Sequence, residues 1–564
     1  MIYQVLPRLF GNACATCRHN GTLKENGSGK FADFSSKALR KIKNMGFSHI
    51  WYTGIIRHAS KTDYSSFGIP QSHPAVVKGN AGSPYAIADY YDVCPDLAID
   101  VNKRMKEFEA LVERTHNQGL KVIIDFVPNH VARQYQSITK PKGVKDFGKN
   151  DDTSLAFSPN NNFYYMPETD FSGQFDLSAG KEIYCEHPGK VTGNDRFDAS
   201  PGVNDWYDTV KLNYGVDYLN YRKPHFSPTP STWKKMIDIL LFWTSKGVDA
   251  FRCDMAEMVP VEFWNWAIPK VKAKKKDMLF IAEIYLPHEY RNYLETGKFD
   301  YLYDKVGLYD TLRNVICGYD FASSISQCWQ RLGDMQHRML NFLENHDEQR
   351  IASNYFVGNP FAALPGMIVA ATMNVNPVMI YNGQELGEKG MDNEGFSGID
   401  GRTSIYDYWS MTSVRNWIND GNFDEKKLTY SQVSLRNFYI KLLKLCNSEK
   451  AVSKGLFYDL MYVNQDNPDF NPLKQYAYIR TDEEDMLLIV VNFDDRDVDV
   501  AVNIPKHAFD FFLIAEKKNV TCKDLLTGET IKRNIIPDNK FAMQIPSHTG
   551  RIYKWKHAKR LTFG

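Results

Sequence analysis

The sequence of 564 residues lacks the features that set other protein classes apart from ordinary globular chains. It has no apolar run that spans a membrane, because prolines and asparagines interrupt the best stretch, residues 362–381. It has no low-complexity segment, and hydrophobic residues make up 43% of it, which excludes wholesale disorder. Its 9 cysteines, an odd number spread over a long chain, exclude a disulfide scaffold.

The sequence also has little net charge. Its formal net charge is +1 at pH 7, whereas proteins that chiefly bind nucleic acid carry clustered lysine and arginine in excess. The one dense basic run, residues 272–276, is typical of a solvated helix end. Cys14 and Cys17 form a CxxC pair, but no second pair follows at a spacing that suits zinc. We therefore expect neither nucleic acid nor a zinc site.

The first residues do not form a signal peptide. The chain opens instead on a strand-like run, residues 2–6 (IYQVL). Because proteins rarely begin inside a core element, we expect the N-terminus to have been processed. Processing would favour a location outside the cytoplasm, and the sequence leaves the compartment undetermined.

One pattern recurs through the first part of the chain: a helical stretch ends at a glycine and a short apolar run follows. The glycines and the runs are Gly46 with 49–53, Gly119 with 121–125, and Gly247 with 248–252. Glycine in this place is a left-handed helix stop. Short apolar runs are typical of strands buried on both faces. The repetition predicts a parallel α/β sheet, open or closed.

Charged residues end most of these runs, namely Asp125, Asp254, Glu283 and Asp347. A charge at the end of a buried strand is costly unless it faces solvent or a site. In a (β/α)₈ barrel, that end of the strands carries the active site. The spacing from Asp254 to Glu283 corresponds to one βα unit of roughly 30 residues, and the spacing to Asp347 to two more. The sequence therefore predicts a closed barrel.

Two segments depart from the repeat. A loop-rich stretch with interleaved aromatics lies between Asp125 and Asp254, and after residue 448 β-rich runs appear at 486–492, 498–502 and 511–514. The predicted fold is thus α/β, a TIM barrel with a subdomain inserted after strand 3 and a C-terminal antiparallel β-sandwich. Its predicted parts are the barrel at 1–131 and 225–448, the insertion at 132–224 and the β domain at 449–564.

Four motifs surround the charged residues, namely 125–130 (DFVPNH), 247–254 (GVDAFRCD), 280–283 (FIAE) and 342–347 (FLENHD). In this order they resemble the α-amylase superfamily of glycoside hydrolases, nearest to its cyclomaltodextrinase, neopullulanase and α-amylase branches. Weaker matches lie at 210–213, at 2–5 and at 381–385, the latter two resembling the family's first and eighth strands. The resemblance covers essentially the whole chain. It implies a retaining hydrolase that cleaves α-1,4-glucosidic links in starch-like glucans or maltooligosaccharides.

The resemblance assigns catalytic roles to three carboxyl groups. Cleavage with retention needs two of them about 5–5.5 Å apart, one to attack the anomeric carbon and one to protonate the leaving oxygen. By position, Asp254 resembles the nucleophile and Glu283 the acid/base, whose pKa should be raised. Asp347 resembles the third carboxylate, which grips sugar hydroxyls and stabilises the transition state.

Four further residues form the substrate-binding set that the resemblance implies. His130 and His346 match the histidines that bind hydroxyls of the sugar being cleaved. Tyr85 matches the aromatic that stacks on that sugar, with core packing as the alternative. Arg252 lies two residues before Asp254, hence on the same side of the strand, where its guanidinium would keep the nucleophile ionised. We expect Asp125 to orient Arg252 rather than to touch substrate.

The sequence departs from the family pattern at positions that are associated with calcium in other members. Many members follow the nucleophile with a Lys-His pair tied to calcium, and here residues 255–258 read MAEM. Asn129 nevertheless matches a calcium ligand of the first motif. In the loop at 25–30, Lys30 stands where an acidic ligand of a second calcium would be, and a cation there opposes Ca²⁺. We expect no cofactor for the chemistry and no metal at that loop, and the calcium at Asn129 stays open.

Three functions remain compatible with the motifs. The favoured one is the retaining α-glucan hydrolase. The second is a transglycosylase, which passes the glycosyl group to a sugar and would differ on an acceptor side shaped by Glu257, Lys211 and residues 400–402. The third is a non-catalytic carbohydrate-binding protein, against which the three catalytic carboxylates argue. The sequence does not distinguish α-1,4 from α-1,6 preference.

Overall fold

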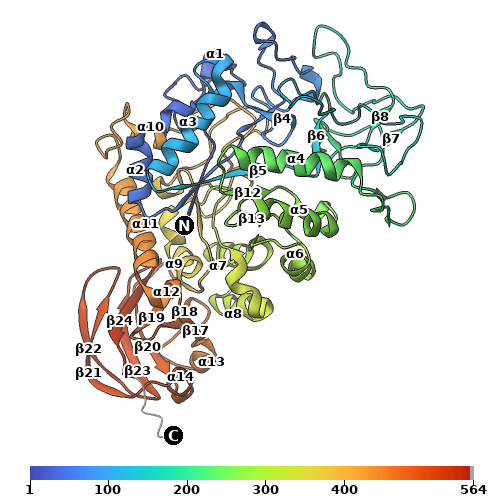
Figure 1. Cartoon of the computed structure of the whole chain (residues 1–564). Coiled ribbons are helices and arrows are strands. Elements are labelled where there is room, and N and C mark those ends of the chain that lie inside the picture. The colour runs from blue at the N-terminus through green and yellow to red at the C-terminus, as the bar shows by residue number, and fades with distance from the viewer. Residues whose placement is uncertain (559–564) are drawn as a thin grey trace.

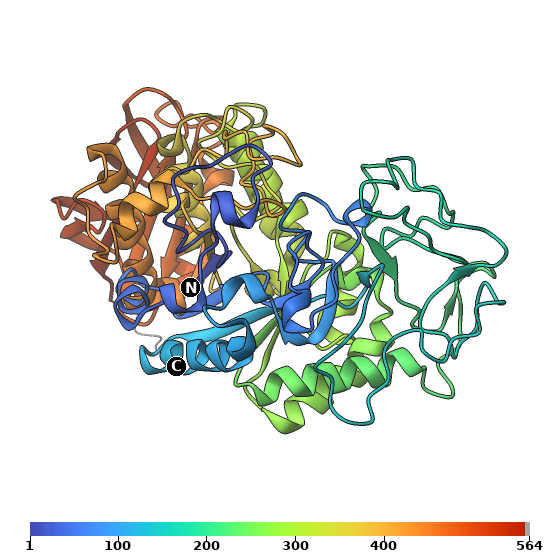
Figure 2. The same ribbon diagram turned by 90° about the horizontal axis from the view of Figure 1, so that it is seen from above.

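The computed structural model describes residues 1–558, which form a barrel, an inserted subdomain and a C-terminal β domain (Figure 1). The inserted subdomain, drawn in cyan to green, and the red C-terminal domain lie on opposite sides of the barrel (Figure 2). Over residues 1–558, no helix combines the length and apolar character that crossing a membrane requires.

Eight parallel strands form the barrel, which confirms the predicted fold class. They are β1 (Ile2–Val5), β2 (His49–Tyr52), β5 (Lys121–Phe126), β12 (Ala250–Cys253), β13 (Leu279–Ala282), β14 (Tyr301–Tyr303), β15 (Met339–Leu340) and β16 (Met379–Tyr381). Their order is β15-β14-β13-β12-β5-β2-β1-β16. A parallel bridge between Asn341 and Val378 joins the two outer strands and closes the barrel.

Each barrel strand contributes one side chain to a single cluster of buried residues. These residues are Ile2, Trp51, Ile123, Ala250, Ile281, Tyr303, Leu340 and Met379. Side chains alternate along a strand, so the neighbours of these residues point outward towards the helices. The barrel interior is therefore a packed core and not a channel.

Helices surround the barrel. The longer ones are α2 (Ser36–Asn44), α3 (Arg104–Asn117), α4 (Ser231–Ser245), α5 (Val261–Lys274), α8 (Ile325–Leu332), α9 (Leu364–Thr372) and α11 (Tyr430–Ser448); α6 (Tyr290–Glu295), α7 (Asp310–Ile316) and α10 (Thr412–Ile418) are shorter. Past the ends of α2, α3 and α4, Gly46, Gly119 and Gly247 have φ of 113°, 69° and 91°. These values confirm the predicted glycine stops.

The inserted subdomain lies between β5 and α4. It is mostly loop, with the short antiparallel pairs β6 (His130–Ala132) with β9 (Thr209–Lys211), β7 (Tyr165–Met166) with β8 (Gly189–Lys190), and β10 (Val216–Asp217) with β11 (Lys223–Pro224). The loop after β2 carries a further pair, β3 (Ile56–His58) with β4 (Ile87–Val93). The β6–β9 pair places His130 opposite Lys211.

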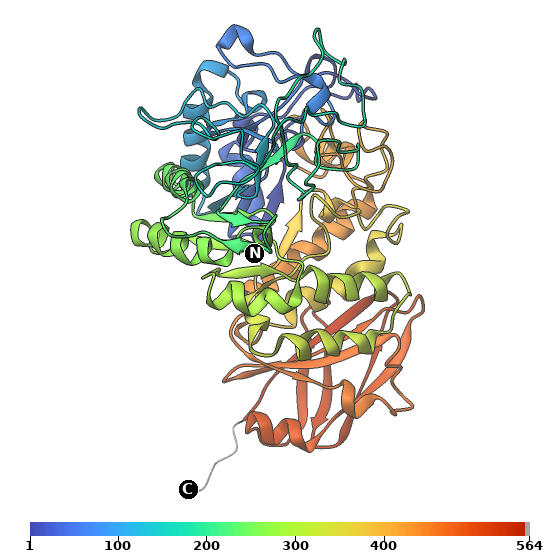
Figure 3. The same ribbon diagram turned by 90° about the vertical axis from the view of Figure 1, so that its right-hand side faces the viewer.

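The C-terminal domain is antiparallel. One sheet has the order β17 (Leu456–Asp459), β18 (Gln475–Thr481), β19 (Asp485–Asn492), β24 (Thr549–Lys556), β21 (Lys517–Asp524), β22 (Thr530–Ile535), and β20 (Val498–Ile504) pairs with β23 (Asn539–Ile545). The predicted strands at 486–492 and 498–502 correspond to β19 and β20. This domain lies below the barrel in Figure 3.

The strand predicted at 511–514 is wrong, because helix α14 (Lys506–Phe512) ends in this segment. Phe509 and Phe512, three residues apart, are buried, whereas Phe511 between them is 50% exposed. That spacing is helical, with one face on the core. Four consecutive apolar residues do not distinguish a strand from a helix end when their periodicity is ignored.

Candidate active site

A cavity of about 250 Å³ lies at the carboxyl ends of the barrel strands, beside the inserted subdomain. Its lining residues are Lys78, Ser83, Tyr85, His130, Trp206, Asp208, Thr209, Asp254, Met255, Glu283, Tyr285, Asp347, Ile405 and Tyr406. Five of the seven predicted site residues are in this set. The other two, Arg252 and His346, lie behind the wall of the cavity.

Arg252 brings two of the carboxylates together. Because β12 and β13 are parallel and in register, Asp254 and Glu283 follow neighbouring strand ends. One terminal nitrogen of Arg252, Nη1, lies 2.7 Å from Oδ1 of Asp254, and the other, Nη2, lies 2.8 Å from Oε2 of Glu283. A single guanidinium thus holds both carboxylates side by side.

The structure corrects the place of Arg252 in the predicted substrate-binding set. The residue is 0% exposed, so it does not reach the cavity. Its guanidinium lies 5.3 Å from the ring centres of Trp51 and Tyr85, and its Nε donates to the hydroxyl of Tyr303 at 3.1 Å. Two carboxylates and an aromatic cage compensate for the desolvation of this charge. Arg252 positions the carboxylates rather than contacting a ligand.

Glu283 has further partners. The backbone N–H of Met255 donates to its Oε2 at 2.8 Å, and the hydroxyl of Tyr285 donates to its Oε1 at 2.6 Å. Burial raises the pKa of Glu283, the charge of Asp254 adds to this, and Arg252 opposes both. Burial likewise raises the pKa of Asp254, against the effect of Arg252. The raised pKa of Glu283 agrees with the sequence-based expectation for an acid catalyst.

Met255 has φ of 41°, in the left-handed region that a side chain with a Cβ rarely adopts. This conformation directs its N–H at Glu283, immediately after Asp254. A strained residue that is held in place by its surroundings is typical of functional sites.

The third carboxylate lies next to His346. Oδ2 of Asp347 is 3.1 Å from Nε2 of His346, and the side chain of Asp347 keeps 42% of its surface exposed. Desolvation of its carboxyl group within the cavity raises the pKa of Asp347 to about 8, with the charge of Glu283 as the next cause. Asp347 therefore faces the cavity in the company of like charges.

His346 itself does not face the cavity, because its side chain is 0% exposed. Its Nδ1 lies 2.8 Å from Nε2 of Gln4, and its Nε2 also contacts the hydroxyl of Tyr85. Burial lowers the pKa of His346 well below its usual value, and Arg252 lowers it further, so the imidazole is neutral. In this structure His346 supports Tyr85 and Asp347, and its binding of sugar hydroxyls stays a prediction.

Tyr85 has features of both roles that the sequence left open, stacking on the sugar and packing in the core. It lines the cavity, but only 9% of its surface is exposed, and its ring stacks on that of His346 at 5.2 Å. Asp125 lies beneath it and accepts a hydrogen bond from Nε1 of Trp51 at 3.0 Å. The Arg252 Nη1 atom is 3.5 Å from Asp125, a longer contact than the one to Asp254.

The inserted subdomain supplies residues that the sequence reasoning missed. Trp206 lies 5.2 Å from the ring of His130, and Asp208 lies 3.6 Å from Nζ of Lys78. Burial lowers the pKa of His130 to about 3, so this imidazole is neutral too. Tyr285 and Tyr406 complete the polar wall. The aromatic residues of the insertion were the available signal for Trp206, whereas Lys78 lies in a long loop without a motif.

The expected acceptor-side residues do not line this cavity. Oε2 of Glu257 accepts backbone hydrogen bonds from Tyr285 and Leu286 at 2.9 and 3.0 Å, so it fixes the segment that follows Glu283. Arg402 donates to the backbone carbonyl of Asp347 at 2.5 Å. These side chains hold the cavity wall from outside.

A known protein family matches most of this chain. The family model described as the catalytic domain of α-amylase matches residues 4–430. The chain belongs to the α-amylase family. It is also 21% identical over 503 residues to α-amylase 2 of Dictyoglomus thermophilum, which covers 88% of this chain and 70% of that protein.

Solved structures share the fold of this α-amylase family member. A maltogenic α-amylase from Thermotoga neapolitana superposes with a TM-score of 0.63 at 19% identity, covering 99% of this chain and 98% of that one. A cyclomaltodextrin glucanotransferase superposes with a TM-score of 0.64 at 18% identity, covering 98% of each chain. The likeness includes the barrel, the insertion and the C-terminal domain.

The calcium position that the α-amylase resemblance implied at Asn129 is taken by an ammonium group. Nζ of Lys211 lies 2.5 Å from Oδ1 of Asn129 and 2.6 Å from Oδ1 of Asp195, and its side chain is 2% exposed. A divalent cation there would face this ammonium at close range. No cluster of three His, Cys, Asp or Glu side chains suited to a metal occurs within residues 1–558. The residues present at Asn129 do not fit calcium.

Proposed function

We propose that the protein is a retaining glycoside hydrolase that cleaves α-1,4-glucosidic links in starch-like glucans or maltooligosaccharides. The observation that carries this proposal is the pair of carboxylates, Asp254 and Glu283, on the two nitrogens of the Arg252 guanidinium. Retaining cleavage needs two carboxyl groups about 5–5.5 Å apart on either side of the bond. Family membership and the names of the relatives support an α-glucan as the substrate.

In the proposed first step, Asp254 attacks the anomeric carbon while Glu283 gives its proton to the leaving oxygen. Burial and the charge of Asp254 raise the pKa of Glu283, which keeps that proton in place. Arg252 keeps Asp254 ionised by direct contact. The product is an ester between Asp254 and the sugar, and the leaving hydroxyl has gained the proton.

In the second step the charge on Asp254 is gone, because its oxygen is bonded to carbon. The pKa of Glu283 then falls, since one of the causes that raised it has been removed. Glu283 takes a proton from water, and the water oxygen attacks the anomeric carbon and releases Asp254. Asp347, exposed to the cavity, would bind sugar hydroxyls as charge develops on the ring.

A product time course tests the proposal. We would incubate the protein with maltoheptaose, soluble starch, pullulan and β-cyclodextrin, and follow the products and their anomeric form. Release of shorter α-maltooligosaccharides is the expected result. Products longer than maltoheptaose would instead identify a transglycosylase on the same site. No product from any substrate would contradict the proposal and point to a binding protein.

Asp254→Asn tests the role of the nucleophile. We expect kcat to fall by more than about a thousandfold, because an amide forms no glycosyl ester. Folding and maltoheptaose binding should be retained, as measured by circular dichroism and calorimetric titration. Asp420→Asn, at a side chain that is 80% exposed, is the matched control and should leave kcat unchanged. Retained turnover in Asp254→Asn would rule out this nucleophile.

A further inference from the structure

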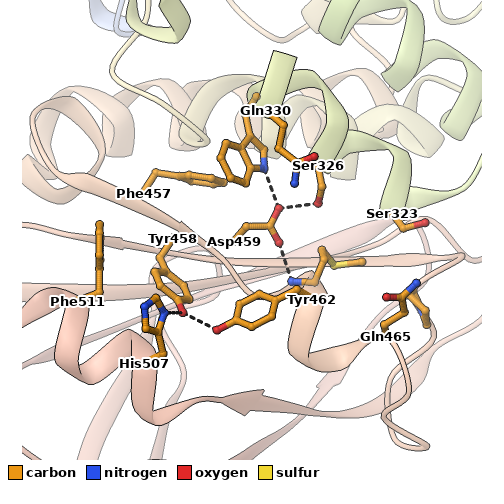
Figure 4. Close-up of a pocket in the computed structure, with 13 residues that line it drawn as sticks. Ser323, Ser326, Gln330, Phe457, Tyr458, Asp459, Tyr462, Gln465, His507 and Phe511 are labelled. Atoms are coloured by element: carbon orange, nitrogen blue, oxygen red, sulfur yellow. Dashed lines mark hydrogen bonds between the residues drawn. The ribbon is translucent and has the colours of Figure 1, made fainter. Parts of the chain in front are cut away.

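A second and larger cavity, of about 790 Å³, lies between helix α8 of the barrel and the C-terminal domain. Its aromatic lining consists of Trp329, Phe457, Tyr458, Tyr462 and Phe511 (Figure 4). It shares no lining residue with the active-site cavity. The mechanism proposed above makes no use of it.

Hydrogen bonds hold the rings of Tyr458 and Tyr462 in place. The hydroxyl of Tyr458 lies 2.6 Å from the hydroxyl of Tyr462 and 2.6 Å from Nδ1 of His507. Figure 4 draws both contacts as dashed lines. Tyr462 and Phe511 are nevertheless 57% and 50% exposed. A ring such as Tyr462, held by a hydrogen bond and partly exposed, offers contact area to a ligand at little entropic cost.

The cavity has no free charge with which to attract an ionic ligand. Its one carboxylate, Asp459, accepts hydrogen bonds from Nε1 of Trp329, the hydroxyls of Ser326 and Tyr476 and the backbone N–H of Met461, at 2.8, 2.5, 2.9 and 2.6 Å. No lysine or arginine is among the lining residues, all of which the structure describes. Phosphate-bearing ligands and acidic peptides therefore find no counter-charge here.

Polar groups without protein partners lie beside the rings. The amide groups of Gln330 and Gln465 line the cavity, are exposed, and have no hydrogen-bond partner within the described residues. An amide donates and accepts hydrogen bonds without carrying charge. The cavity thus combines aromatic faces with neutral donors and acceptors.

We propose that this cavity is a second carbohydrate-binding site, which holds a segment of a neutral α-glucan oligosaccharide away from the active site. A pyranose ring has an apolar face of C–H groups that stacks on Tyr462 or Phe511, and a rim of hydroxyls that hydrogen-bonds to Gln330 and Gln465. The volume lies within the range of sites for small ligands, about 300–1,000 Å³. That the sugar is an α-glucan rests on the proposed function.

The test uses the full-length chain carrying Glu283→Gln, which strongly slows turnover and leaves the second cavity unchanged. Titration with maltoheptaose, followed calorimetrically, should show two classes of site. Adding Tyr462→Ala with Phe511→Ala should weaken the second class by about tenfold or more, since two stacking contacts are lost. Tyr430→Ala, at an aromatic that is 90% exposed outside the cavity, is the matched control and should retain both classes.

A second measurement separates this site from the chemistry. In the otherwise wild-type protein, Tyr462→Ala with Phe511→Ala should reduce adsorption to granular starch and leave kcat/KM on a chromogenic maltotrioside unchanged. Gln465→Ala, a milder change, should reduce adsorption in the same direction. Unaltered adsorption and a single class of maltoheptaose site in the Glu283→Gln chain would overturn the proposal. Absent hydrolysis with intact adsorption would overturn only the proposed function.

Discussion

At the scale of single residues, the site depends on how one cation keeps several buried carboxylates together. Arg252 contacts Asp254 and Glu283, and Asp347 lies close enough for their charges to raise its pKa. Three adjacent carboxyl groups do not all ionise readily next to one guanidinium. Burial raises the pKa of all three carboxyl groups and Arg252 opposes that rise, whereas the proposed mechanism needs Asp254 ionised and Glu283 protonated.

The protonated state of Glu283 gives a prediction about pH. Because burial raises its pKa, loss of its proton should set the basic limb of the kcat/KM profile. Glu283→Gln should lower kcat on maltoheptaose by roughly 10²- to 10⁴-fold. With maltotriosyl fluoride, whose leaving group needs no proton, the first step should survive without that basic limb. A basic limb that persists in the variant would assign it to another group.

Asp347 gives a prediction about stability. Its pKa is raised to about 8 in the folded protein, against about 3.9 in an unfolded chain, so the folded state binds this proton more tightly. The resulting stabilisation is present below about pH 4 and is lost as the pH rises to about 8. The Asp347→Asn variant has no ionisable group at this position, so its stability does not fall with pH for this reason.

The Tm of Asp347→Asn relative to wild type should therefore increase between about pH 4 and pH 8 and level off above that. Its side chain is 42% exposed, so solvent moderates the size of the effect. Thermal unfolding across this pH range measures it. A difference in Tm that stays constant with pH would contradict the raised pKa.

At the scale of elements, the β6–β9 pair connects the active site to the inserted subdomain. It pairs His130, which lines the cavity, with Lys211, whose ammonium binds Asn129 and Asp195. A lysine here ties the first-motif loop to the insertion with no metal ion. Stability should thus be independent of divalent cations, and EDTA at about 1 mM should leave the Tm unchanged.

Lys211→Met tests this tie directly. Removing the ammonium leaves Asp195 and Asn129 without their partner, and we expect a loss of about 3 kcal/mol in the free energy of unfolding. Lys518→Met, at an exposed lysine of β21, is the matched control and should change it little. Denaturant unfolding provides the measurement. An EDTA-sensitive wild type that calcium restores would instead place a metal at this position.

At the scale of the whole molecule, Arg480 joins the C-terminal domain to the barrel. It is 0% exposed on β18, and its guanidinium donates to the carbonyls of Met373, Val452 and Gly455 at 2.7, 2.9 and 2.8 Å. Met373 follows the barrel helix α9, and Val452 belongs to α12 (Lys450–Ser453). One side chain thus satisfies backbone groups from both domains.

Arg480→Met should weaken this connection. Buried carbonyls would be left without donors, so we expect the C-terminal domain to unfold about 5 °C earlier, as a calorimetric transition separate from that of the barrel. Arg533→Met, which removes hydrogen bonds made only within the C-terminal domain, is the control and should not split the transition. A single unshifted transition in Arg480→Met would show that other contacts suffice.

The sequence by itself determined the fold and the family, because short local patterns of residues identify both. Glycine stops, short apolar runs and strand-end charges predict a parallel barrel, and four motifs identify the α-amylase family, which the match over residues 4–430 confirms. The barrel strands β14 and β15, of three and two residues, are too short for periodicity to detect. The end of helix α14 was predicted as a strand, because four apolar residues are too few to reveal helical periodicity.

Only the tertiary structure decided which side chains face the cavity and which support it. Arg252 and His346 lie in strong motifs, yet both are buried behind Tyr85 and the carboxylates. Trp206 and Lys78 reach the cavity from segments without a motif, and Lys211 takes the place expected for calcium. These outcomes depend on contacts between residues far apart in the chain, and on which groups burial deprives of water, neither of which local sequence specifies.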